Sequence, residues 1–200
     1  PMQIGFISPA RRSSHSGKIN GRAFAFPSLA LTLLAALTPP EDEVFLADEN
    51  VEEIDFNRVP DLVAITVMTS TAPRAYEIAD LFKQKGARVA LGGIHPTALP
   101  EEAAQHCDSV VIGEAEGVWQ QLLGGFKNGG LRKYYRAETR PLLAELPFPR
   151  RDILNGKRYF LTSTMQTTRG CPFDCSFCCV TKFFGRSFRT RPVEHVAREV

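Results

Sequence analysis

The sequence lacks several features that mark particular protein classes. It has only five cysteines in 200 residues, and its formal net charge is +2 with a charged fraction of 23%. This near balance of charge gives no case for a nucleic-acid or membrane-surface partner. Four of the five cysteines lie within nine residues of one another, so the scattered pairs of a disulfide-stabilised secreted domain are missing.

Long hydrophobic runs are also missing. The most apolar stretch, residues 24–37, has 14 residues, which is too short to span a bilayer. Its Leu29, Leu33 and Leu37 recur at i, i+4 and i+8, a pattern typical of a buried helix. Residues 1–7 lack the basic and apolar regions of a signal peptide. We therefore expect a cytoplasmic protein without a membrane span.

The cysteines that are present form a compact group. Cys171, Cys175 and Cys178 stand at spacings of four and three residues. Thiolates this close can bind three irons of an iron–sulfur cluster, and they leave a fourth iron open for chemistry. A zinc site would need a second Cys or His half-site, and the nearest histidine, His195, is alone. We predict a [4Fe–4S] cluster on these three residues, with Cys179 as a bystander.

Over residues 1–127, short apolar runs alternate with segments whose apolar residues recur with helical periodicity. Strands are predicted at 4–8, 44–47, 62–68, 88–91 and 109–112. Helices are predicted at 27–37, 71–85, 100–106 and 116–126, with a long loop over 11–22. This alternation indicates a flavodoxin-like (Rossmann-like) α/β domain with a five-stranded parallel sheet. Ligands of such folds bind at the carboxyl ends of the strands, so we expect the functional loops to follow Ser8, Met68, Leu91 and Ile112.

Several strings carry a family resemblance. The Cys-x3-Cys-x2-Cys spacing, with Phe177 before the last cysteine and residues 167–170 leading in, resembles the radical S-adenosylmethionine (SAM) superfamily. Upstream, residues 61–66, 92–97 and 111–116 follow one another as in the cobalamin (B12)-binding-domain class of these enzymes. The resemblance covers essentially the whole chain. That class includes C-methyltransferases and the anaerobic magnesium-protoporphyrin monomethyl ester cyclases.

The resemblance implies three cofactors: a [4Fe–4S] cluster, SAM beside Phe177, and cobalamin in the first domain. Glycines at strand ends let a macrocycle or a nucleotide approach the backbone closely, although such glycines can also simply form turns. Cobalamin contacts are implied for residues at the strand ends, namely Thr69, Ser70, Gly92, Gly93, His95, Gly113 and Glu114.

The implied function is methyl transfer to an unactivated carbon of a small-molecule or peptide substrate. In this class an external one-electron donor reduces the cluster, SAM is cleaved to a 5′-deoxyadenosyl radical, and methylcobalamin supplies the methyl group. Two alternatives stay open. One is a non-catalytic cofactor-binding module, and the other is a radical SAM cyclase or oxidoreductase whose first domain does not bind cobalamin.

The remaining residues are expected to form a linker and an unfinished second domain. Glycines and prolines punctuate residues 128–158, with a short hairpin predicted at 131–136. A strand at 160–168 should deliver the cysteine loop, and a helix should begin at Pro192. Radical SAM enzymes build a (β/α) barrel, and a full barrel needs roughly 250 residues. We expect residues 159–200 to be the start of an incomplete barrel, and the chain to be an inactive amino-terminal fragment.

The histidines and Cys107 each have a separate expected role. Cobalamin proteins with a histidine cobalt ligand carry D-x-H-x-x-G, whereas His15 lacks the preceding Asp that would orient its ring. We expect His15 to be a solvated loop residue. For His95 a cobalamin contact and a turn-stabilising role both remain open, and His106 and Cys107 are interpreted as structural.

Basic residues follow the cysteines, at Lys182, Arg186, Arg189, Arg191 and Arg198. We expect them on the solvated surface, and the alternative is that one of the arginines at 189 and 191 faces the SAM carboxylate or the cluster. A nicotinamide or flavin domain is disfavoured because no G-x-G-x-x-G follows a strand. A methylthiotransferase would need further upstream cysteines, and only that at 107 is available.

Overall fold

The main body is an α/β domain built on one parallel sheet. The structure, a computed structural model, describes residues 1–11 and 26–200. Six strands lie in the order β2-β1-β3-β4-β5-β6, and every pairing is parallel. Their bounds are β1 Gln3–Ser8, β2 Glu43–Asp48, β3 Leu62–Thr66, β4 Arg88–Gly92, β5 Ser109–Ile112 and β6 Tyr134–Arg136. The predicted flavodoxin-like fold class is confirmed, with one strand more than expected.

The strand order explains where a ligand can bind. The chain builds β1 and β2 toward one edge and then returns to add β3, β4 and β5 toward the other edge. A cleft forms at the carboxyl ends of the strands where the order reverses. Leu62, Val63, Ala64 and Ile65 of β3 are all buried, as expected of a β-branched, apolar strand that is covered on both faces.

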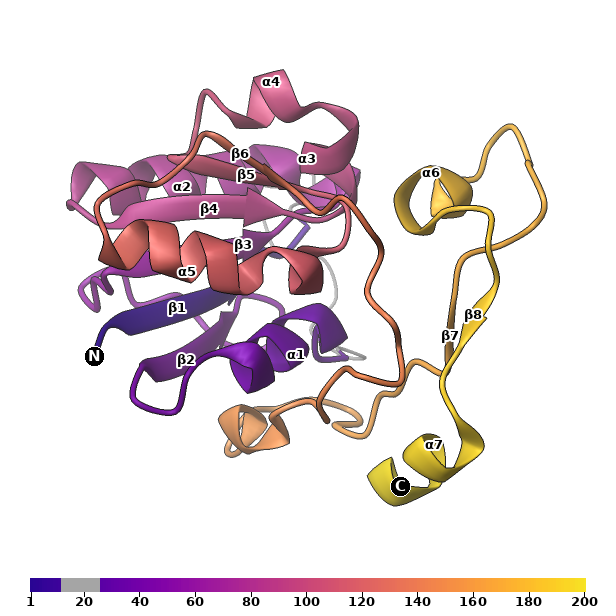
Figure 1. Ribbon diagram of the computed structural model, residues 1–200. Coiled ribbons are helices and arrows are strands. Elements are labelled where there is room, and N and C mark those ends of the chain that lie inside the picture. Colours follow the sequence, from indigo (N-terminus) through magenta and orange to yellow (C-terminus); the bar gives the residue numbers. More distant parts are fainter. Residues whose placement is uncertain (12–25) are drawn as a thin grey trace.

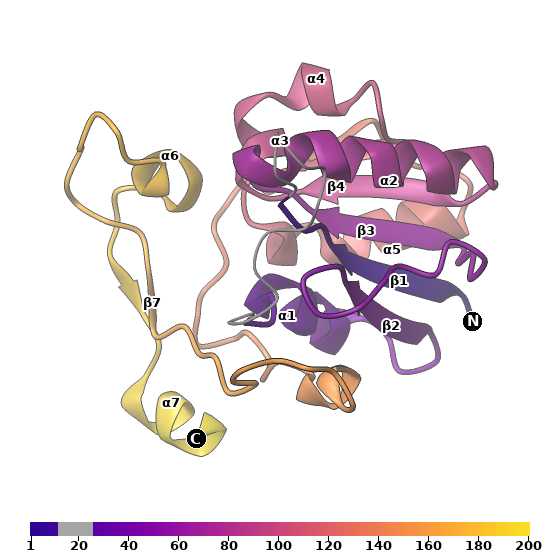
Figure 2. The ribbon, with the colours of Figure 1, turned by 180° about the vertical axis from the view of Figure 1, so that it is seen from behind.

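Helices cover both faces of the sheet. On one face, α1 (Leu29–Leu37) and α5 (Trp119–Lys127) pack against the strands through a first apolar core. On the other, α2 (Ala72–Gln84) packs through a second core, which includes Ile78 and Phe82 (Figures 1 and 2). The sheet therefore lies between two apolar layers, and only its strand ends are open to a ligand.

Several helix bounds differ from the sequence prediction. The predicted helix 71–85 is a 3₁₀ turn, η2 (Thr69–Thr71), followed by α2, and β3 ends at Thr66 before it. The predicted helix 100–106 is the shorter α4 (Pro100–Ala103), and α3 (Ile94–Ala98), directly before it, was not predicted. The helix predicted at 116–126 is the turn η3 (Ala115–Gly117) followed by α5.

The hairpin predicted at 131–136 is wrong. Tyr134–Arg136 instead forms β6 and pairs in parallel with β5. Tyr135 is 1% exposed and belongs to the first apolar core. Burial of this one ring fixes the strand at the sheet edge, and three residues are too few for periodicity to reveal it.

Two further predictions concern α1 and the residues before it. The predicted helix 27–37 is α1, which begins at Leu29, two residues after Pro27. The predicted loop 11–22 and His15 fall almost entirely in residues 12–25, outside the described residues. Among the described residues, no helix has both the length and the apolar character needed to cross a bilayer.

The carboxyl-terminal segment extends beside the sheet domain (Figure 1). It contains the elements η4 (Arg151–Leu154), β7 (Thr168–Arg169), α6 (Val180–Phe184), β8 (Arg189–Thr190) and α7 (Val193–Glu199). The strand predicted at 160–168 is wrong, because only Thr168 and Arg169 find a partner, antiparallel to β8. Phe160 and Leu161 are more than half exposed, so an alternating pattern alone did not make a strand here.

Candidate functional site

An apolar cavity of about 420 Å³ opens at the carboxyl ends of β3 and β4. Apolar residues of both cores line it: Leu31 and Leu34 of α1 and Trp119 of α5 from the first core, and Ile65 of β3 and Leu91 of β4 from the second. Few polar groups reach it, and they belong mainly to the segment after β5 and to the carboxyl-terminal segment. A pocket of this size and character suits a drug-sized apolar group.

The structure brings together four of the seven predicted cobalamin contacts. Gly92, Gly93, Gly113 and Glu114 all line the apolar cavity. Thr69 and Ser70 are exposed in η2, and neither they nor His95 belong to the cavity lining.

The backbone requires a glycine at Gly93 but not at Gly92. Gly93 has φ +109°, and a Cβ there would lie 2.7 Å from the Val67 carbonyl oxygen. Its backbone therefore excludes any side chain, with or without a ligand. At Gly92 a Cβ would meet only Val111 Cβ at 3.5 Å, an ordinary contact, so the turn itself does not demand glycine there.

His95 is bound within the protein. Its ring is buried, with Nε2 at 3.0 Å from Tyr76 Oη and 3.2 Å from Glu102 Oε1. Its backbone N–H donates to the Val67 carbonyl at 3.1 Å. Burial, reinforced by Glu102, raises the pKa of Tyr76, so this phenol stays protonated. These contacts match the turn-stabilising interpretation of His95.

His106 and Cys107 also have structural partners. The His106 ring stacks on Tyr76 at 4.2 Å, and its Nδ1 lies 2.9 Å from Asp80 Oδ2. The Cys107 thiol is buried and donates to the Ala103 carbonyl at 3.2 Å. Burial raises the pKa of Cys107 to about 11, so it remains a protonated thiol rather than a metal-binding thiolate.

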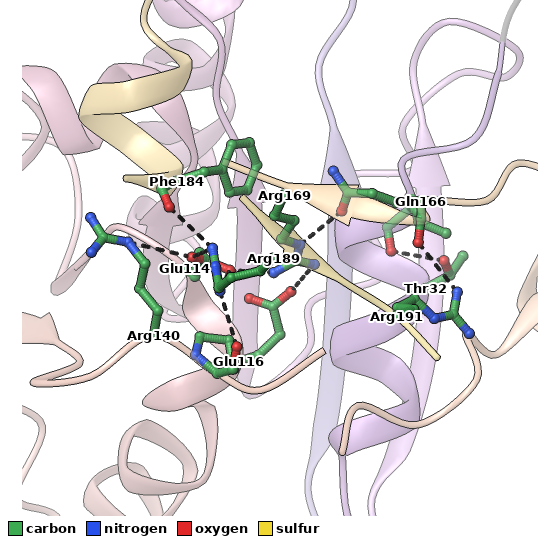
Figure 3. Close-up of polar contacts among 11 residues, drawn as sticks. Thr32, Glu114, Glu116, Arg140, Gln166, Arg169, Phe184, Arg189 and Arg191 are labelled. Carbon is green, nitrogen blue, oxygen red and sulfur yellow. Dashed lines mark hydrogen bonds and ion pairs between the residues drawn. The ribbon is translucent and has the colours of Figure 1, made fainter. Parts of the chain in front are cut away.

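A buried ion network joins the sheet domain to the cysteine segment (Figure 3). Glu114 Oε2 accepts from Arg169 Nη1 at 2.6 Å, and Glu114 Oε1 accepts from Arg189 Nη2 at 2.5 Å. Glu116 Oε1 accepts from Arg169 Nη2 at 2.6 Å. Burial lowers the pKa of Arg169, but Glu116 and Glu114 outweigh it and the pKa is raised overall.

This network sets the position of the cysteine loop. Arg169 is two residues before Cys171, and Glu114 follows β5 at the rim of the apolar cavity. Buried ion pairs repay their desolvation only when they are well hydrogen-bonded, and the short forked contacts here meet that condition. The start of the cysteine loop is thus fixed beside the cavity.

The prediction of a solvated basic surface is wrong for Arg189 and Arg191. Their side chains are 16% and 9% exposed and pair with Glu114 and Glu199, respectively. Arg186 is 64% exposed, as predicted. Local sequence patterns could not identify these partners because they are distant: Glu114 and Arg189 are 75 positions apart. The sequence does contain one signal for them: Glu114 and Glu116 follow a buried strand. Acidic side chains need cationic partners if they are buried.

The three predicted cluster ligands lie between β7 and α6. Cys171, Cys175 and Cys178 are free thiols, and the one at 175 is exposed. In the part of the chain that the structure describes, no three His, Cys, Asp or Glu side chains are gathered as a metal site. The donors fit an iron–sulfur cluster in kind and accessibility, while this loop conformation does not bring the sulfurs together. Phe177 is 91% exposed.

Two glycines close the loop. Gly170 has φ +86°, and a Cβ there would lie 2.0 Å from the Ser187 carbonyl oxygen. Gly185 has φ +84°, and its carbonyl accepts from the Cys171 N–H at 3.2 Å. Both ends of the loop therefore depend on backbone conformations that favour glycine.

Comparisons with known proteins agree with these observations. The family model described as "B12 binding domain" matches residues 24–123. Bacteriochlorophyllide d C-8(2)-methyltransferase of Chlorobaculum tepidum is 40% identical over 82% of this chain and 38% of its own length. The C-12(1)-methyltransferase of the same organism is 35% identical over 94% and 42%. An uncharacterized methyltransferase of Pyrococcus horikoshii is 32% identical over 87% and 45%. The chain spans less than half the length of each relative.

Proposed function

Because this chain belongs to the B12-binding domain family, as its sequence predicted, we propose that it binds a corrinoid at the apolar cavity. The observation that carries the proposal is the position of the cavity. It lies at the carboxyl ends of the strands, where α/β sheets of this topology bind ligands, and most of its lining residues fall in the matched segment. A volume of about 420 Å³ suits one apolar part of a corrinoid, such as its nucleotide base, rather than the whole cofactor.

The cobalt is proposed to take no ligand from the described histidines. No histidine among the described residues lines the cavity, and His95 is already bonded to Tyr76 and Glu102. The absorption spectrum of bound hydroxocobalamin tests this, because histidine ligation shifts the corrin bands. We expect bands without a protein imidazole ligand, and the bands of an imidazole-ligated form would contradict it.

For the whole protein we propose radical SAM methyl transfer. Cys171, Cys175 and Cys178 would hold a [4Fe–4S] cluster. When bound, the cluster supplies the electron that cleaves SAM, and methylcobalamin supplies the methyl group. The chain's own residues bring these sites together, because Arg169 and Phe184 of the cysteine segment line the same cavity as Gly92 and Glu114. The methyltransferase names of the relatives support this reaction type.

A second candidate is a cofactor-binding module without catalysis of its own. It is favoured for this chain by the cysteine sulfurs, which are not gathered to one point in the described loop. Anaerobic incubation with SAM and a reductant separates the two candidates. We expect no SAM cleavage by this chain alone, and release of 5′-deoxyadenosine by it would remove the second candidate.

Corrinoid binding can be tested with two substitutions on one helix. Ala30 lines the cavity at its rim, whereas Ala36, also in α1, does not. Ala30→Trp should fill the opening and weaken hydroxocobalamin binding at least tenfold, while Ala36→Trp should bind as the unmodified chain does. Equal affinity of all three proteins would place the corrinoid elsewhere.

Cluster binding can be tested with two neighbouring cysteines. After anaerobic reconstitution, Cys175→Ala should lose most iron and sulfide, because one of three thiolate ligands is removed. Cys179→Ala, the matched control, should retain them. Full iron and sulfide content in Cys175→Ala would contradict the ligand assignment.

A further inference from the structure

A second cavity of about 290 Å³ lies beside the apolar one. The two share Gly113, Glu114 and Phe183 in their linings. The second is bounded by the ends of β5 and β6, the segment 137–140, and α6, the helix after the cysteine loop. It therefore adjoins both the predicted corrinoid site and the helix that follows the predicted cluster loop.

Three cations line this second cavity: Arg136, Arg140 and Lys182. The acidic residues of its lining are Glu114 and Glu138. Both carboxylate oxygens of Glu114 already accept hydrogen bonds from arginines outside this cavity. One accessible carboxylate thus faces three cations, and the cavity carries an excess of positive charge.

Two of the three cations have no partner among the described residues, and Arg140 has only a long ion pair with Glu114. In residues 1–11 and 26–200, no hydrogen bond or ion pair holds the Arg136 or Lys182 side chain. Arg140 Nε lies 3.9 Å from Glu114 Oε1, beyond hydrogen-bonding distance. Their donor groups are consequently free for a ligand.

Arg140 is placed by packing. A Cβ on Gly185 would lie 2.6 Å from its Cζ and 2.8 Å from its Nε. The guanidinium therefore rests against the Gly185 backbone, and a larger residue there would displace it from this position. This contact holds a planar donor fork at the cavity without using its hydrogen bonds.

We propose that this cavity binds an oxyanion, either a carboxylate or a phosphate. Arginine and lysine recognise both through charge-assisted hydrogen bonds. Two sources fit the position: the nucleotide phosphodiester of a corrinoid, or an anionic group of the substrate. The inference goes beyond the proposed function, because the oxyanion site is defined by residues outside the apolar cavity and can exist without cobalamin binding.

The test begins with inorganic phosphate as the probe. Titration of the chain, followed by ³¹P NMR and thermal denaturation, should show saturable binding. Arg136→Gln/Lys182→Gln should weaken it at least tenfold, and Lys83→Gln/Lys85→Gln, which removes the same charge from the end of α2, should leave it unchanged. No saturable binding, or equal weakening in both double variants, would overturn the proposal.

Two corrinoids then identify the source. Cobinamide lacks the nucleotide phosphodiester that cobalamin carries. Weaker cobalamin binding in Arg136→Gln/Lys182→Gln, with cobinamide unaffected, assigns the cavity to the corrinoid phosphate. Unchanged affinity for both corrinoids assigns it to an anionic substrate group. If the chain binds phosphate at this site but no corrinoid, the proposed function fails and this inference stands.

Discussion

The sheet domain and the cysteine segment are stabilised in different ways. The sheet domain has two apolar cores, in which Phe6, Ile65 and Phe82 are at most 2% exposed. In residues 159–200 the buried residues are Arg169, Thr181 and Gly185, none with an apolar side chain. The first region is thus held by hydrophobic burial, and the second is attached to the first largely by arginine–carboxylate pairs.

This difference has a consequence for stability. Apolar burial depends little on salt or pH, whereas ion pairs depend on both. Regions with few buried apolar contacts open at a lower free-energy cost than the core. The cysteine segment should therefore detach from the sheet domain under conditions in which the sheet remains folded.

The largest expected effect is in the apolar core. Phe82 in α2 is 1% exposed, whereas its neighbour Leu81 is 38% exposed. Phe82→Ala should lower the free energy of unfolding by about 3–5 kcal/mol through lost burial and a cavity, measured by urea denaturation. Leu81→Ala, as the control, should cost less than about 1 kcal/mol. Similar losses in both variants would contradict the assigned core.

The next effect concerns the ion network. Glu114→Gln keeps the side-chain shape but leaves Arg189 without a charged partner and Arg169 with Glu116 alone, at a cost of about 1–3 kcal/mol. Hydrogen exchange should increase in residues 159–200 and stay unchanged in the sheet. Glu145→Gln, an exposed position, should change neither region. Faster exchange throughout the sheet would show that the two regions are not separately stabilised.

A substitution that disturbs the closure of the cysteine loop should cost a similar or smaller free energy. Gly170→Ala forces a side chain onto a positive φ and against the Ser187 carbonyl, at about 1–3 kcal/mol. Limited proteolysis should then cut near the cysteines sooner. Gly124→Ala, inside α5 with open space around it, should instead stabilise slightly. If the protease cut the loop of Gly170→Ala as slowly as that of the unmodified chain, the loop closure described above would be contradicted.

The smallest expected effect is a pH dependence at α7. Burial raises the pKa of Glu199, but hydrogen bonds from Arg151 and Arg191 outweigh it, so the pKa is lowered from 4.5. Its stabilising contribution is therefore complete above about pH 4.5 and is lost as the pH falls through the lower folded-state pKa. The protection factors of the α7 amides, which correct for the pH dependence of intrinsic exchange, should fall below pH 4.5. In Glu199→Gln this dependence should disappear, and persistence there would assign it to another group.

Local patterns predicted most of the fold. The β-branched run of β3 and the helical period of α2 are properties of contiguous residues, and both elements formed where expected. Strand β6 was missed because burial of Tyr135 depends on residues far along the chain. Residues 160–168 alternate like a strand, but no neighbouring strand is available to most of them. Strand formation needs a partner, which a pattern does not supply.

The site was predictable to a similar extent. The cysteine spacing and the glycines at the strand ends are local features, and Gly92 and Gly93 do line the cavity. The ion network depends on residues about 50 or more positions apart, such as Glu114 and Arg169, so spacing could not reveal it. Charged side chains beside buried strands indicate only that partners must exist.

We propose that the sheet domain holds a corrinoid and the cysteine segment an iron–sulfur cluster. The most direct test is anaerobic reconstitution with iron, sulfide and hydroxocobalamin, followed by desalting and absorption spectroscopy with metal analysis. We expect corrin bands and an iron–sulfur band both to be retained on the protein. Loss of the corrin while the iron–sulfur band persists would contradict the proposed role of the sheet domain.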